Sequence, residues 1–307
     1  MVQIPRASCM DVSNTVDVTD PTAVSSAVQE ILYQRFPKYD FSSIDVLVSD
    51  FSRLYGGSFP GFRACELPYH DKQHVLDVTL AMARLLDGHE VAPGEAGPLG
   101  PDLALAGIAA ALFHDSGYIR RVRDTRNKNG AAYTRIHVRR GARFLADYLP
   151  GVGLQDLVGV CTRIVYFTGY QTDPRNLPVA SDQERCLGEL LGTADLIAQM
   201  ADVDYLRKCR DHLYEEFKIG GIAGERGEAF HNGMVFHSPD HLLETTPDFI
   251  RNTIAVRLDG QFGGVHRYAA RFFGGSNLYM DAILDNCRRL QLLLSGDTRE
   301  LTSASLP

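Results

Sequence analysis

The most constraining feature of the sequence is a segment that is apolar on every side and ends in two polar residues. After Pro101 the chain reads DLALAGIAAALF, and His114 and Asp115 follow directly. A helix that is apolar all round is buried in a protein core. The chain must therefore fold around this helix and bury an ionisable pair at its end. That pair needs compensation for its charge, either from a hydrogen-bonded cap or from a divalent cation.

The rest of the sequence also follows a helical pattern, with apolar residues recurring at three- and four-residue spacing. Asp20 followed by Pro21 is typical of a helix start, and Gly88 is expected to end the helix that begins near residue 71. Helices are expected over about residues 21–36, 42–54, 71–87, 101–113, 133–149, 154–168, 183–201, 203–218 and 276–294. The glycine-rich residues 219–240 leave a hairpin open. The expected fold class is all-α.

Three regions are expected along the 307 residues. Residues 1–20 are predicted to form a polar N-terminal tail that is disordered or loosely docked. Residues 21–218 are predicted to form the main helical domain, and residues 219–307 a C-terminal helical extension packed on it.

Charge and hydropathy exclude several classes of partner. The net charge is −7, so neither stable nucleic-acid binding nor membrane-surface binding is expected. The chain has no apolar run long enough to span a bilayer and no apolar signal-peptide core near its start. Its six cysteines are scattered, which predicts free thiols in a reducing compartment. These features predict a cytoplasmic protein.

Two histidines lie four residues apart in the segment YHDKQH. This spacing puts His70 and His74 on one face of a helix. They could share a metal, or one could bind the metal while the other transfers a proton. They could equally be ordinary surface histidines.

A third polar position lies inside another apolar helix. Asp195 is flanked by leucine and isoleucine in the segment LLGTADLIAQM. An aspartate in such surroundings needs a cation or a hydrogen-bond donor as its partner. Asp202 and Asp204 are closer to the helix end, where water can solvate them, so Asp195 is the preferred candidate.

Together, a histidine, a His-Asp pair and a later aspartate, each on its own apolar helix, resemble the metal motif of the HD superfamily of phosphohydrolases. The segment YHDKQHVLDV also resembles the YHNxxHxxDV segment of the class I cyclic-nucleotide phosphodiesterases, which belong to that superfamily. Asp71 stands where those enzymes have asparagine. The resemblance covers about residues 69–200 and implies that the main domain is an HD-domain helical bundle.

The resemblance implies a role for each matched residue. His74, His114, Asp115 and Asp195 would be the metal ligands, and Asp115 would also bridge to a second ion if one is bound. His70 would act in catalysis beside Asp115 as the proton donor to the leaving oxygen. The cofactor would be manganese, magnesium, zinc, iron, nickel or cobalt, as one or two ions.

His137 is a further candidate, in the segment RIHVRRG. Branches of the superfamily that hold two metals use a histidine here and another about two dozen residues later. The second position reads CTRIVYFTG in this chain, without a histidine. His137 is therefore expected either to contact a second metal or a phosphate, or to be a plain histidine on a helix surface.

A basic stretch follows the His-Asp pair. Between residues 120 and 143 there are nine Lys or Arg residues, with Asp124 as the one acid. Such an island in an acidic protein suits an anionic, phosphate-bearing substrate, although it could also be a solvated helix face. The side chains expected on the substrate side are Arg120, Arg121, Lys128 and Arg139.

These patterns predict a metal-dependent phosphohydrolase that cleaves a phosphoester of a nucleotide or a related small phosphorylated metabolite through metal-activated hydroxide. Two other functions remain open. One is a di-iron oxygenase, which also occurs on HD scaffolds, and the other is a nucleotide-binding HD module without catalysis. A homodimer is compatible with all three functions.

Overall fold

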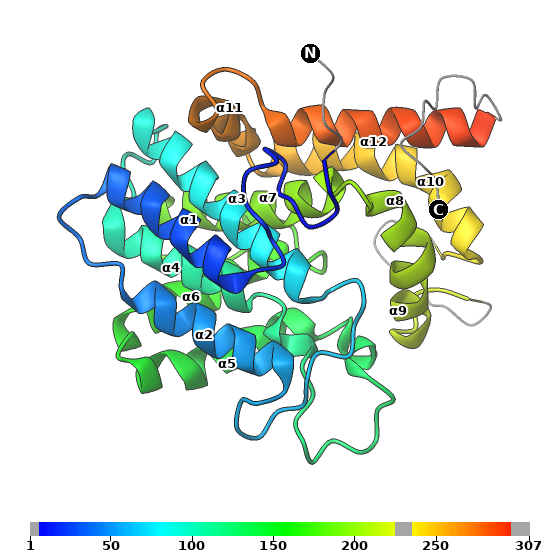
Figure 1. The fold of residues 1–307 in the computed structure, drawn as a ribbon, viewed down its shortest axis with the longest axis horizontal. Helices are drawn as coiled ribbons and strands as arrows, with labels where there is room; N and C mark the ends of the chain where they lie inside the picture. Colours follow the sequence, from blue (N-terminus) through cyan, green and yellow to red (C-terminus); the bar gives the residue numbers. More distant parts are fainter. Residues whose placement is uncertain (1–5, 225–234, 296–307) are drawn as a thin grey trace.

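The computed structural model describes residues 6–224 and 235–295, and within them the fold is all-α, as predicted (Figure 1). The helices are α1 (Pro21–Arg35), α2 (Ser43–Gly56), α3 (Lys72–Val91), α4 (Gly100–Phe113), α5 (His137–Tyr148), α6 (Val158–Ile164), α7 (Asp182–Ala201), α8 (Tyr205–Lys208), α9 (Tyr214–Ile219), α10 (Pro239–Asn252), α11 (Tyr268–Phe272) and α12 (Leu278–Ser295). The β structure in these residues is limited to isolated bridges. None of the described helices is both long and apolar enough to cross a lipid bilayer.

Helices α3, α4 and α7 form the centre of the bundle. Every residue of α4 from Ala104 to Phe113 is buried, as the apolar segment predicts. α3 packs against α1, α4, α7 and α11, and α7 packs against α12 (Figure 1). The three central helices therefore carry the His-Asp pair and its candidate partners into one buried region.

Most of the predicted helices are present, but their ends differ in informative places. Gly88 does not end α3, which continues to Val91. A Cβ atom at Gly88 would lie 2.0 Å from the Tyr268 carbonyl oxygen, so this glycine instead allows α11 to pack closely on α3. The predicted helix over 154–168 is broken into 3-10 turns on either side of the short α6.

The C-terminal extension contains helices that no periodicity predicted. Helix α10 continues directly into a π-helical segment over Thr253–Gln261, and α11 follows. α10 packs beside α12 (Figure 1), and α12 packs on α7, so helices that follow residue 219 pack on those that precede it. Residues 219–240, for which the sequence allows a hairpin, contain a single parallel bridge in their described part, between Ala223 and Phe236. Residues 225–234 lie outside the described residues.

The prediction of a disordered or loosely docked N-terminal tail is wrong for residues 6–20. Asp11 is 1 % exposed and its carboxylate lies 2.6 Å from Nη2 of the buried Arg84 on α3. The backbone amides of Thr15 and Val16 also donate to Asp11. A buried ion pair thus ties the segment to the core, and a polar composition alone could not reveal it.

Replacing Asp11 by alanine is expected to cost about 3–5 kcal/mol of stability, because the buried guanidinium of Arg84 loses its counter-charge. Burial opposes ionisation, but Arg84 and the hydrogen bonds to Ser13 and Val16 lower the pKa of Asp11 to about 2. This contribution is therefore fully present above pH 4 and is lost as the pH falls toward 2. Urea unfolding at neutral and acidic pH measures both effects.

The exposed Asp156→Ala is the matched control and should unfold like the wild type. If Asp11→Ala had the same free energy of unfolding as Asp156→Ala, the Asp11–Arg84 ion pair would not stabilise the docked N-terminal segment.

Candidate functional site

The four residues expected to bind metal meet at one point, although they come from three separate parts of the chain. His74 is in the first turn of α3, where Asp71 caps the helix by accepting from the His74 amide at 2.9 Å. His114 and Asp115 follow the end of α4, and Asp195 lies in the middle of α7. The Asp115 Oδ2 atom is 3.2 Å from His114 Nε2 and 3.6 Å from His74 Nε2. The Asp195 Oδ1 atom is 3.4 Å from His74 Nε2 and 3.7 Å from His114 Nε2.

These separations fit a shared cation. Ligand atoms around one ion, each at about 2.1 Å, lie roughly 3.0–3.5 Å from one another. His74, His114 and Asp115 have ligand atoms within 4.8 Å of one another and are all buried. The described residues therefore contain a donor set of imidazole nitrogen and carboxylate oxygen that could hold a divalent metal.

The hydrogen bonds of the site agree with such an ion. His114 Nε2 and Asp115 Oδ2 are buried and have no hydrogen-bond partner. The Nδ1 atom of His114 lies 2.8 Å from the Ala111 carbonyl oxygen and donates to it, which leaves the Nε2 lone pair free. Buried polar atoms without partners are costly in proteins, and a backbone carbonyl that accepts from the other ring nitrogen commonly orients a metal-binding histidine. The residues present thus fit a metal ion.

Without the cation, a proton takes its place. Burial lowers the pKa of His114, but the adjacent Asp115 raises it to about 9. Burial likewise opposes ionisation of Asp115, yet His114 holds the pKa of this carboxyl far below its usual range. Metal binding at this site must therefore displace a proton from His114.

His70 lies on the cavity wall beside this cluster and is held by a carboxylate. Its Nδ1 atom is 2.6 Å from Glu216 Oε2 on α9, and the other Glu216 oxygen accepts from the Tyr69 amide. Burial alone would lower the pKa of His70, but the charge and hydrogen bond of Glu216 raise it to about 9. His70 is therefore a protonated imidazole near neutral pH whose orientation is fixed.

His137 faces the other side of Asp115. Its Nε2 atom is 3.8 Å from Asp115 Oδ1, while its Nδ1 donates to the Thr134 carbonyl oxygen at 2.7 Å. Tyr118 stacks between His137 and His70, with ring centroids 4.3 Å and 4.6 Å apart. His137 therefore lies on the cavity wall with a free nitrogen toward the carboxylate, where a second ion or a phosphate could bind.

A glycine brings His137 close to the His-Asp pair. A Cβ atom at Gly117 would lie 1.8 Å from the His137 carbonyl oxygen. Gly117→Ala is therefore expected to push the start of α5 away and to cost roughly 3 kcal/mol through overpacking. Thermal unfolding measures this loss. Gly151→Ala is the control, since nothing lies within 4 Å of its Cβ position, and equal unfolding of the two variants would contradict the close-approach argument.

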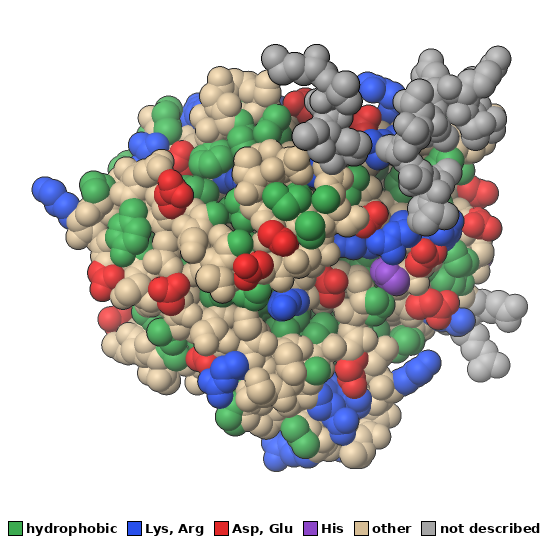
Figure 2. All heavy atoms as spheres, in the orientation of Figure 1, with side chains coloured by type: hydrophobic (Ala, Val, Ile, Leu, Met, Phe, Trp, Pro, Cys, Tyr) green, Lys and Arg blue, Asp and Glu red, His purple; other side chains and the backbone are tan. Residues whose placement is uncertain are grey.

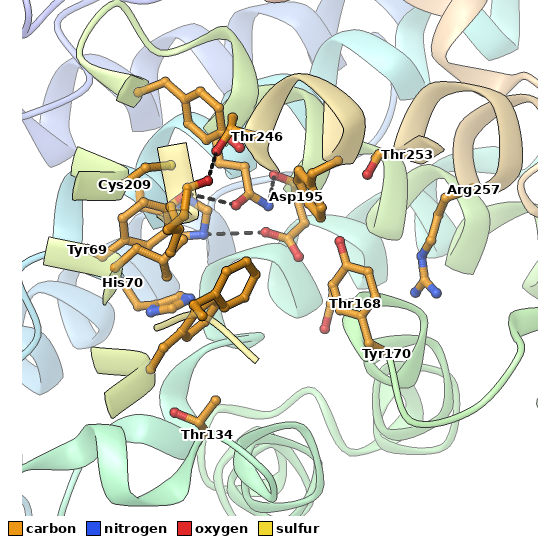
Figure 3. A pocket seen from close by; sticks show the side chains of 18 of the residues that line it. Tyr69, His70, Thr134, Thr168, Tyr170, Asp195, Cys209, Thr246, Thr253 and Arg257 are labelled. Atoms are coloured by element: carbon orange, nitrogen blue, oxygen red, sulfur yellow. Dashed lines mark hydrogen bonds and ion pairs between the residues drawn. The ribbon is translucent and has the colours of Figure 1, made fainter. Parts of the chain in front are cut away.

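The cluster opens into a cavity of about 350 Å³. Its lining combines residues of the main domain, such as His70 and Asp195, with residues of α10 and the following π-helical segment, such as Thr246 and Arg257 (Figure 3). This volume is typical of a site for a small molecule. The C-terminal extension, whose role the sequence did not indicate, thus completes the cavity.

The basic side chains expected to face the substrate do not line this cavity. Arg120 is buried elsewhere, where it forms a two-point ion pair with Glu66 at 2.7 Å and donates to the carbonyls of Asp124 and Asn127. Arg121, Lys128 and Arg139 are exposed. Figure 2 shows Lys and Arg side chains along the lower edge of the molecule, near the loop before α5. Within the basic stretch, Arg120 therefore has a structural role, whereas Arg121, Lys128 and Arg139 lie on the protein surface.

Three residues of the site were missed by sequence reasoning: Glu216, Tyr118 and Arg257. Tyr118 follows the motif by three residues and could have been suspected from that position. Glu216 contacts His70, and Arg257 lines the cavity, only through tertiary packing, and no local spacing marks either residue.

Comparison with known proteins adds no identification. The sequence matches no family model, and no curated protein matches it. Membership of the HD superfamily is therefore a proposal that depends on the residues of the site.

Proposed function

We propose that this chain is a metal-dependent phosphohydrolase of the HD type that cleaves a small phosphoester. The observation that carries the proposal is the convergence of His74, His114, Asp115 and Asp195, with two of their ligand atoms buried and without hydrogen-bond partners. A structural hydrogen-bonded pair would satisfy its own atoms. This cluster leaves them turned toward one another at 3.2–3.7 Å, close to the separations of ligand atoms around one cation.

Each residue of the site has a task in the proposed reaction. A divalent cation bound there would lower the pKa of coordinated water toward about 7 and polarise phosphoryl oxygens. His74, His114, Asp115 and Asp195 would hold the cation, and the second carboxylate oxygen of Asp115, Oδ1, lies 3.8 Å from His137 Nε2. On that side of Asp115, His137 Nε2 can bind a second ion or accept a hydrogen bond from the substrate.

His70 supports a hydrolytic reaction in particular. Ester cleavage needs a proton for the departing oxygen, and a positioned general acid contributes about 10²–10⁴-fold to such reactions. Glu216 keeps His70 protonated and fixes the ring, so that Nε2 is the remaining position for proton donation. The cavity volume of about 350 Å³ suits a small phosphorylated metabolite or a mononucleotide.

The test is the metal content of the purified protein, together with its turnover of a phosphomonoester and a phosphodiester reporter in added manganese. Near-stoichiometric metal and hydrolysis of either reporter support the proposal, and the preferred reporter narrows the substrate class. Iron with an oxygen-dependent reaction and no hydrolysis would favour a di-iron oxygenase. Nucleotide binding without turnover under any divalent metal would favour a binding module.

A further inference from the structure

The cavity contains a buried cation that the proposed reaction does not use. Arg257 lies in the π-helical segment Thr253–Gln261, and among the residues that line the cavity in the described chain it is the one Lys or Arg. It is 5 % exposed. π-helical turns are rare and are frequently found at functional sites.

Arg257 is incompletely satisfied by the protein. Its Nη2 donates to the carbonyl oxygens of Phe167 and Gly169, at 3.0 Å and 2.5 Å. Its Nε is buried and has no hydrogen-bond partner. The guanidinium lies against the rings of Tyr170 and Phe262, at 4.6 Å and 5.0 Å from their centroids.

No carboxylate in the described residues lies within ion-pair distance of Arg257, although other acids are near the cavity. Asp248 lines the cavity but pairs with Arg251, and Asp173 pairs with Arg175. A buried guanidinium without a carboxylate in direct contact is costly, so an anionic group is favoured at this end of the cavity. Arginine also has the planar donor geometry that carboxylates and phosphates match.

The position of Arg257 separates it from the candidate metal ligands. In Figure 3, Arg257 and Tyr170 lie on the side of the pocket opposite His70, with Asp195 between them. A single phosphate at the metal cluster would therefore leave Arg257 without an acceptor. An elongated ligand with a charged group at each end would satisfy both ends of the cavity.

We propose that the cavity selects substrates with a second oxyanion, a carboxylate or a phosphate, at the end remote from the scissile phosphoester, and that Arg257 is its receptor. This inference rests on the proposed function in one respect, which is that the group bound at the metal-ligand cluster is the scissile phosphoester. The far group is bound by Nη1 of Arg257, while Nη2 keeps its hydrogen bonds to the two backbone carbonyls.

Binding of non-hydrolysable ligands tests this independently of turnover. Isothermal titration of the manganese-supplemented protein compares α,ω-alkane bisphosphonates and ω-carboxyalkyl phosphonates with alkyl monophosphonates of equal length. We expect one chain length at which a second oxyanion strengthens binding by roughly 10- to 100-fold, as for charge-assisted hydrogen bonds. The two ligand series distinguish phosphate from carboxylate as the preferred far group.

Arg257→Gln should abolish this difference between paired ligands, whereas Arg267→Gln, an exposed arginine outside the cavity, should retain it. A merely structural role for Arg257 would weaken both members of each pair equally, so the ratio separates the two roles. Equal binding of paired ligands by the wild type, or a ratio unchanged in Arg257→Gln, would overturn the inference. An Arg257-dependent ratio in a protein that hydrolyses neither reporter would reject the hydrolase and retain the anion site.

Discussion

Asp115→Ala is expected to remove both metal and turnover. Asp115 is the one residue of the cluster whose two oxygens face different sides, toward His114 and toward His137. Its loss removes a charged ligand and any bridge between two ions. Removing a residue that only hydrogen-bonds to a metal ligand already lowers metal affinity about 10- to 100-fold. Removing Asp115, which is itself a proposed ligand, should therefore lower metal affinity by more than about 100-fold. Metal analysis of the purified variant and hydrolysis of the preferred reporter measure the two effects.

The folded state should survive this change, which makes the result interpretable. Without Asp115, His114 can release the proton that this carboxylate holds on it and keep its hydrogen bond to the Ala111 carbonyl, so no unpaired charge stays buried. The variant should therefore unfold near the metal-free wild type, while added manganese should raise the melting temperature of the wild type alone. Asp211→Asn, at an exposed residue paired with Arg210, is the control and should bind metal normally. Full metal occupancy in Asp115→Ala would show that the metal binds elsewhere in the protein.

The convergence of His114, Asp115 and Asp195 could be predicted from the sequence because each of them disturbs an otherwise apolar helix. His114 and Asp115 end a segment that is buried all round, and Asp195 interrupts a leucine-rich helix. Such residues are costly unless they meet a partner, so local sequence already indicates that they share one. The all-α class follows from the same periodicity, which is strongest where helices are long and one face is buried.

The second half of the site has no such local signal. Arg257 lies in a π-helical segment, whose wider turn does not follow the spacing used to recognise a helix. Glu216 is one of two adjacent glutamates on α9, and only the packing of α9 against the loop before α3 distinguishes it from its exposed neighbour Glu215. The basic stretch misled for a related reason, since charge composition does not show which arginines face a cavity and which, like Arg120, hold a loop.

His70→Gln is expected to retain metal and to lose about 10²–10⁴-fold in kcat. His70 Nδ1 is held by Glu216 and not by a residue of the cluster, so metal content should equal that of the wild type. Its imidazole contributes only a proton, and the effect should therefore be largest with a reporter whose leaving group is a poor one. Loss of metal in His70→Gln would remove the proposed acid role and make the residue a ligand.

Glu216→Gln separates the acid role from a packing role for the same histidine. Glutamine can still hydrogen-bond to His70, but the negative charge that raises the pKa of His70 is lost and the effect of burial, which lowers it, remains. Activity that needs protonated His70 is present below its pKa and falls as pH rises through it. The alkaline limb of the kcat–pH profile should therefore move to lower pH in Glu216→Gln and stay in place in the exposed control Glu215→Gln. An unchanged alkaline limb in Glu216→Gln would mean that His70 does not donate the proton, because no other carboxylate in the described residues lies within hydrogen-bond distance of its ring.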